Sequence, residues 1–77
     1  MAIAAAFPNP SDWERKAALR IRARREQLAL SQEQMAGDAG MSVRHYKKVE
    51  GGSIDPRLTS MFAIAHALRT TVGEIAD

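Results

Sequence analysis

The chain has 77 residues, of which 45% are hydrophobic, and it contains no cysteine. This length fits one domain with a single core and no deep catalytic cleft, and the lack of cysteine excludes disulfides and cysteine-ligated zinc. The net charge is only +2, but ten of the eleven lysines and arginines lie between Arg15 and Arg57, with five of the nine acidic residues. Such a basic segment suits a polyanionic partner, and a solvated helix face explains it equally well.

The start of the chain carries no signal for a membrane or for export. The longest apolar run, Met1–Phe7, is far shorter than the roughly 20 residues that cross a membrane, and it lacks the basic opening of a signal peptide. We therefore expect a cytoplasmic protein with no membrane partner. Pro8 and Pro10 interrupt this region, so residues 1–10 are predicted to form a flexible arm and residues 11–77 the domain.

The first predicted helix runs from Asp12 to Leu28. Ser11 and Glu14 have the spacing of a capping box, in which each side chain satisfies a free backbone N–H. Apolar residues at helical spacing predict a buried stripe, which consists of Trp13, Ala17, Ile21 and Leu28. Arg24 interrupts this stripe, so we expect its stem to cover the edge of the core and its guanidinium to reach solvent.

Two short helices follow, and each opens with a serine. Ser31 begins the second helix with Gln34 as its capping-box partner, and two nearby glycines end it. Ser42 caps the third helix, Val43–Glu50, which stops at a pair of glycines. The apolar positions of the third helix, Tyr46 and Val49, are three residues apart. Its other side is left to Arg44, His45, Lys47 and Lys48.

The last two predicted helices complete the fold. Asp55 and Pro56 are a typical helix start, followed by a core stripe of Leu58, Met61, Phe62, Ala65 and Leu68. The fifth helix begins at Thr71, and its apolar residues, Val72 and Ile75, either form a dimer surface or close the monomer core. Because no segment alternates as a strand would, we predict an all-α fold, a compact bundle of five short helices.

Two short helices joined by a tight turn, the second with a basic outer face, form a helix-turn-helix arrangement. The major groove of DNA is about 12 Å wide and admits one helix, so residues 43–50 are the predicted reading helix. Arg44 can contact guanine with two hydrogen bonds, Lys47 and Lys48 can reach a base or a phosphate, and Val43 can contact a thymine methyl group. The helix N-terminus suits phosphates, so Ser42 is a predicted backbone contact. His45 is either another backbone contact or an uninvolved surface residue.

Residues 31–52, SQEQMAGDAGMSVRHYKKVEGG, resemble the Xre/Cro and phage-repressor family of helix-turn-helix proteins. The family has Ser-Gln and a central Ala in its first motif helix, Gly at the turn, a Ser-capped reading helix that ends in Glu-Asn-Gly, and then a Pro. The corresponding residues here are Ser31-Gln32, Ala36, Gly40, Ser42, Glu50-Gly51-Gly52 and Pro56. The resemblance extends over about residues 21–75 and implies a lambda-repressor-like fold that binds double-stranded DNA.

The resemblance also implies roles for individual residues. Gln32 matches a side chain that contacts a phosphate and braces the reading helix, and Arg57 matches a contact to the DNA backbone. Arg25 and Glu50 match a structural ion pair between the first helix and the end of the reading helix. Four residues match positions that face the bases or the adjacent backbone: Val43, Arg44, Lys47 and Lys48.

The sequence departs from the family pattern at four positions. Arg24 stands where a leucine is usual, and Ala29 stands where glycine often takes a left-handed conformation, which costs alanine about 1 kcal/mol. Gly51 replaces the usual asparagine. Tyr46 is larger than the isoleucine commonly found there, and its hydroxyl needs a partner or an exit to solvent.

Enzyme sites, cofactors and metals are not indicated. His45 and His66 lack the spacing of metal ligands, and no nucleophile stands in a recognisable catalytic arrangement.

We expect a non-enzymatic regulator, a repressor rather than an activator, that binds an inverted-repeat operator as a homodimer and has no small-molecule ligand. The alternative is an antitoxin, or a protein-binding helix-turn-helix module of a toxin–antitoxin or restriction–modification system. Because DNA binding weakens with salt, a salt titration separates the two hypotheses.

Overall fold

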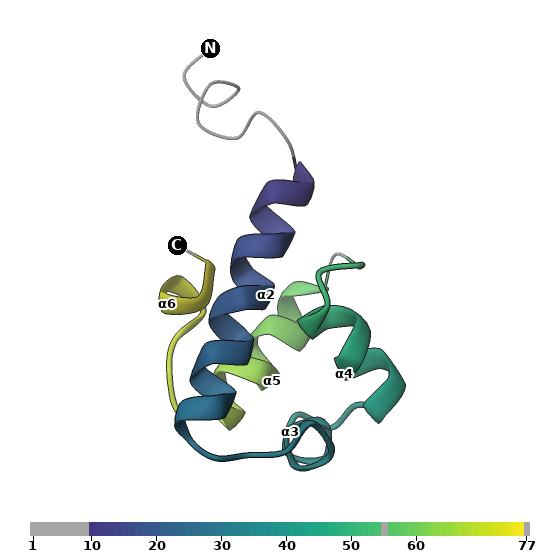
Figure 1. Ribbon diagram of the computed structural model, residues 1–77, viewed down its shortest axis with the longest axis vertical. Helices are drawn as coiled ribbons and strands as arrows, with labels where there is room; N and C mark the ends of the chain where they lie inside the picture. The colour runs from purple at the N-terminus through teal and green to yellow at the C-terminus, as the bar shows by residue number, and fades with distance from the viewer. Residues whose placement is uncertain (1–9, 55, 77) are drawn as a thin grey trace.

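The computed structural model describes residues 10–54 and 56–76, and side chains from residue 14 to residue 75 within these ranges. Its helices are α2 (Pro10–Gln27), α3 (Gln32–Asp38), α4 (Val43–Glu50), α5 (Leu58–Ala67) and α6 (Val72–Ala76). The long α2 stands between α4 and α6, and α3 lies near the C-terminal end of α2 (Figure 1). α5 packs against α3 and α6. The described residues thus confirm an all-α bundle of five helices, whereas the predicted arm, apart from Pro10, lies outside them.

The inward faces of the five helices build one core. Its largest fully buried side chains are Tyr46, Ile21, Met35, Ile64, Leu68 and Ile75. Of the stripe predicted on the first helix, Ala17 and Ile21 are buried and Leu28 packs against the edge of the core, while Trp13 lies outside the described side chains. Ile75 is 2% exposed, so α6 closes the monomer core rather than offering this side chain to a partner.

Serines cap α3 and α4 as predicted. The Ser31 hydroxyl accepts a hydrogen bond from the backbone N–H of Gln34, and the Gln34 side chain accepts one from the backbone N–H of Ser31. The Ser42 hydroxyl accepts a hydrogen bond from the backbone N–H of His45 at 3.1 Å. The predicted cap of the first helix is wrong, because α2 already includes Pro10 and Ser11 therefore lies inside the helix. Proline suits a first helical turn because its φ is fixed near the helical value.

The start and the core stripe of α5 differ from the prediction. The helix begins at Leu58 with Arg57 as its N-cap, two residues later than predicted. Leu58 is 65% exposed and Phe62 is 58% exposed, so neither belongs to the core. Successive helical residues are rotated by about 100°, which turns Phe62 away from its buried neighbour Met61. The buried face instead consists of Met61, Ile64, Ala65 and Leu68.

Within the described part of the chain, two residues other than glycine adopt left-handed backbone conformations at helix ends. Ala29 follows α2 with φ of +56°, as the resemblance implied, and Arg69 follows α5 with φ of +57°. Arg24 bridges these two helix ends: its Nε donates a hydrogen bond to the backbone oxygen of Leu68 at 3.1 Å. The guanidinium was expected to reach solvent, but it satisfies a carbonyl group that the end of α5 leaves without an intrahelical partner.

Candidate nucleic-acid interface

The turn between α3 and α4 fixes the angle between these two helices. Gly40 has φ of +69°, a conformation in which a side chain would be strained. The backbone N–H of Met41 then donates to the carbonyl of Ala36 at 2.9 Å, which closes the end of α3. With the Ser42 cap opening α4 directly afterwards, the chain forms two short helices joined by a tight turn.

The predicted reading helix, α4, has one buried and one basic face. Tyr46 and Val49 are 0% and 3% exposed and anchor the helix in the core. The basic residues of the helix are all exposed. They are Arg44, His45, Lys47 and Lys48. The prediction that these cations point away from the core is therefore confirmed. A helix held from behind in this way presents its basic side chains to any partner that approaches from solvent.

The four residues predicted to face the bases lie together. Val43, Arg44, Lys47 and Lys48 line one shallow hollow of about 580 Å³ beside α4, and Ser53 completes it. Val43 is half-buried. It lines the hollow and also packs against the core, so it contributes to the stability of the fold as well.

Ser53, which the sequence reasoning missed, donates from its hydroxyl to the backbone oxygen of Lys48 at 3.1 Å. Its position directly after the two glycines that end the helix was the available signal. We name the surface formed by residues 43, 44, 47, 48 and 53 the α4 hollow.

The residues predicted to contact the DNA backbone lie around the α4 hollow rather than in it. Ser42 is exposed at the N-terminus of α4, beside the exposed His45. Arg57 is exposed at the N-cap of α5, and its side chain makes no capping hydrogen bond there. Gln32 is half-buried at the start of α3 and turns toward the end of α4.

A buried carboxylate ties three helices together behind this surface. Arg25 of α2 donates from Nε and a terminal nitrogen to the two oxygens of Glu50, at 2.9 and 2.8 Å. Gln32 of α3 donates to one of the same oxygens at 3.3 Å. The Arg25 side chain is 14% exposed and the Glu50 side chain 4% exposed. The structural ion pair implied by the resemblance is confirmed, and Gln32 braces it.

The ionisation of this cluster is shaped by burial and by its partners. Burial alone would raise the pKa of Glu50, but the hydrogen bonds and the charge of Arg25 outweigh it and hold the pKa below the ordinary value of 4.5. The neighbouring Tyr46 is fully buried, and its hydroxyl has no hydrogen-bond partner among the described residues. Burial, followed by the nearby Glu50 carboxylate, raises the pKa of Tyr46. Glu50 is therefore ionised and Tyr46 neutral near pH 7.

The loop that follows α4 passes close to α2. Gly52 has φ of +72°, and a Cβ atom built there would lie 3.4 Å from Cγ of Arg15 and 3.7 Å from Cβ of Ala18. The backbone conformation therefore favours glycine at this position, while the distances themselves are ordinary contacts. The end of α4 thus lies beside α2.

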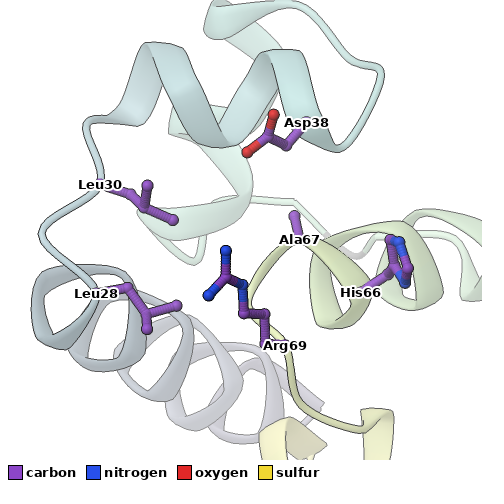
Figure 2. A pocket seen from close by; sticks show the side chains of 6 residues that line it. All are labelled: Leu28, Leu30, Asp38, His66, Ala67 and Arg69. Atoms are coloured by element: carbon purple, nitrogen blue, oxygen red, sulfur yellow. The ribbon is translucent and has the colours of Figure 1, made fainter.

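A second hollow of about 350 Å³ lies where three helices end, and it differs in character from the α4 hollow. Arg69 extends its guanidinium toward the space between Leu28 and Leu30, and Asp38 faces that space from α3 (Figure 2). Helix C-termini carry partial negative charge, which suits the cation of Arg69 but disfavours a bound anion. A polyanion is therefore better received at the α4 hollow.

The described residues contain neither a membrane-spanning helix nor a cluster of metal ligands. None of the helices in residues 10–54 and 56–76 is long and apolar enough to cross a membrane. Within the same ranges, no three histidines, aspartates or glutamates gather in a way that could hold a metal ion.

Comparisons with known proteins agree with this architecture. The sequence model of the helix-turn-helix family matches residues 21–75. The chain belongs to this family, in its Xre and lambda-repressor-type branch, which consists of DNA-binding transcription regulators.

Among solved structures, the restriction-modification controller protein C.AhdI from Aeromonas hydrophila is similar, with a TM-score of 0.78 and 29% sequence identity. The alignment covers 80% of this chain and 94% of that protein. No curated protein matches the sequence.

Proposed function

We propose that the protein is a sequence-specific repressor that places α4 in the major groove of an operator half-site. The observation that carries the proposal is the arrangement of α4, whose cations all point outward while Tyr46 and Val49 anchor it from behind. A short exposed helix of this kind fits the groove and can offer side chains to base edges. The similarity to a restriction-modification controller supports a regulatory role.

Within this proposal, the α4 hollow reads the bases and its surroundings hold the backbone. Arg44 is assigned to guanine because its planar guanidinium can donate two hydrogen bonds to one base. Val43 is assigned to a thymine methyl group, and Lys47 and Lys48 to bases or to the adjacent backbone. The backbone contacts are assigned to Gln32, Ser42, His45 and Arg57. The alternative is a protein-binding role, and the dependence of binding on salt concentration distinguishes it from DNA binding.

Titration of the purified chain into a random-sequence duplex at several salt concentrations tests DNA binding. We expect the logarithm of the affinity to fall linearly with the logarithm of the salt concentration, by about 0.9 for each phosphate neutralised. Lys48→Ala should make this slope shallower, and Arg69→Ala, at the second hollow, serves as the charge-matched control. No binding at low salt would contradict the proposal and favour an antitoxin or another protein-binding role.

We further propose that the protein acts as a homodimer, with α5 rather than α6 at the interface. A single small domain makes few base contacts, and a two-fold pair doubles them on half-sites about one helical turn apart. Leu58 and Phe62 are one turn apart on α5 and are both more than half exposed, and Leu58 begins the helix that follows the reading helix. Such a face supports a self-complementary contact better than the buried Ile75 does.

Replacing Phe62 by lysine tests the dimer interface, because a charge at the centre of an apolar contact disfavours burial. We expect the wild type to sediment as a dimer and the Phe62→Lys variant as a folded monomer with weaker operator binding. Leu19→Lys is the control, because it places the same charge on another exposed apolar residue, 67% exposed, on α2. A variant that remains dimeric would exclude α5 as the interface.

A further inference from the structure

A small pocket lies beside the α4 hollow, at the junction of three helices. It measures about 240 Å³, and its walls come from α2, the start of α3 and the end of α4. The residues that line it are Arg22, Arg25, Gln32, Lys47, Glu50 and Gly51. Lys47 lines both this pocket and the α4 hollow, so the two sites adjoin at this side chain. We name it the junction pocket.

The junction pocket has an excess of positive charge. Both oxygens of Glu50 already accept hydrogen bonds from Arg25, so this pair is internally neutral and its carboxylate is turned to protein donors. Arg22 and Lys47 remain as two cations without a buried counter-charge. Arg22 has an ion pair with Glu26 at 3.8 Å, but the two side chains are 62% and 59% exposed. An exposed pair of this kind contributes little and is easily exchanged for a stronger anion.

The third member of the site is a neutral donor. Gln32 uses one hydrogen of its amide nitrogen to donate to Glu50. An amide nitrogen carries two hydrogens, so the second remains for an acceptor in the pocket. Two cations and one amide N–H that converge from three helices match the needs of a single tetrahedral phosphate group.

We infer that Arg22 joins the phosphate contact already assigned to Gln32, so that one phosphate of the DNA backbone lies in the junction pocket between Arg22, Lys47 and the amide of Gln32. The inference rests on the proposed function, and it adds a residue outside the helix-turn-helix, Arg22, to the interface. Because Lys47 joins the pocket to the α4 hollow, a phosphate held here would set how α4 enters the groove. Backbone contacts of this type fix the register in which base contacts are made.

Removing the Arg22 cation tests the inference on a generic duplex. We expect Arg22→Ala to bind DNA more weakly and with a shallower salt dependence, by up to about 0.9 in the log–log slope, the value for one phosphate. The control is Arg20→Ala, also on α2, whose guanidinium donates to the backbone oxygen of Ile75 at 3.5 Å, on the α6 side of α2 (Figure 1). A slope for Arg22→Ala that equals those of the wild type and Arg20→Ala would overturn the inference.

A second experiment identifies the phosphate itself. On a selected binding site, phosphates are replaced one at a time by uncharged methylphosphonates, and wild-type binding is expected to weaken at one position in each half-site beside α4. In both Arg22→Ala and Lys47→Ala, that position should lose most of its effect, since its cationic partner is already missing. If the two variants respond to different phosphates, the shared pocket is wrong. If the wild type binds no DNA at all, the proposed function fails first, so the two failures are distinguishable.

Discussion

Replacing Arg25 by alanine is expected to lower the free energy of unfolding by about 3 kcal/mol, the usual loss when one member of a buried ion pair is removed. The Glu50 side chain is 4% exposed, so its carboxylate would stay buried and lose two hydrogen bonds at 2.8 and 2.9 Å. Urea denaturation followed by circular dichroism measures the effect. Arg22→Ala is the matched control on the same helix, and its exposed pair with Glu26 should change stability by less than about 0.5 kcal/mol.

The pH dependence of the same variant checks the cause. In the wild type the folded pKa of Glu50 is lowered, so its stabilisation is present above the ordinary value of 4.5 and is lost as the pH falls through the folded pKa. Without Arg25, burial dominates and raises this pKa, so protonation of Glu50 then stabilises the folded variant. The stability gap between wild type and variant should therefore narrow as the pH falls from the raised pKa of the variant, above 4.5, to the lowered pKa of the wild type, below 4.5. A constant gap would show that lost packing, and not the uncompensated carboxylate, explains the destabilisation.

Arg44→Ala is expected to weaken binding to the preferred operator by about 1–3 kcal/mol, or roughly 5- to 150-fold. The physical reason is the loss of the proposed two-hydrogen-bond contact to guanine, which Arg44 would make from its exposed position in the α4 hollow. Because the lost contact is specific for one base, selectivity at that position should relax as well. Fluorescence anisotropy on the selected site and on its single-base variants measures both effects.

The backbone-contact variant Arg57→Ala separates base reading from simple charge. Arg57 is exposed and is proposed to contact a phosphate, so its loss should weaken binding to all sequences alike and leave selectivity unchanged. If Arg44→Ala behaves in the same way, with an unchanged order of preferred bases, then Arg44 does not read a base. Arg44 is exposed, so the Arg44→Ala variant is expected to stay folded, and its melting curve checks this.

Local sequence signals predicted the starts of α3 and α4 but not those of α2 and α5. The caps of α3 and α4 were predicted because a serine at the N-cap accepts a hydrogen bond from a backbone N–H within the first turn, and Gln34 returns one to Ser31 in α3. Tyr46 and Val49 were predicted as anchors of α4 because nearly every other residue of that helix is charged or polar. The pair of Arg25 and Glu50, 25 residues apart, came only from the family resemblance, since no local rule connects them.

The sequence was less informative about α5 and about contacts between helices. Apolar residues surround α5 on several faces, so periodicity alone could not separate the buried Ile64 from the exposed Phe62. The junction pocket was missed because it depends on how α2 crosses the ends of α3 and α4. In the sequence, Arg22 is one of many basic residues on α2. Its proposed contact with a phosphate follows only from its position beside Gln32 and Lys47 in the structure.

Gly52 has a consequence for the evolution of specificity. Its backbone has φ of +72°, which strains any residue that carries a side chain, whereas the space beside Arg15 would accept a Cβ at ordinary contact distance. If α4 reads the bases as proposed, new operator preferences can arise by exchange of residues on its exposed face. Residue 52 is restricted in a different way, because the path of the chain as it leaves α4 requires a conformation that glycine adopts without strain.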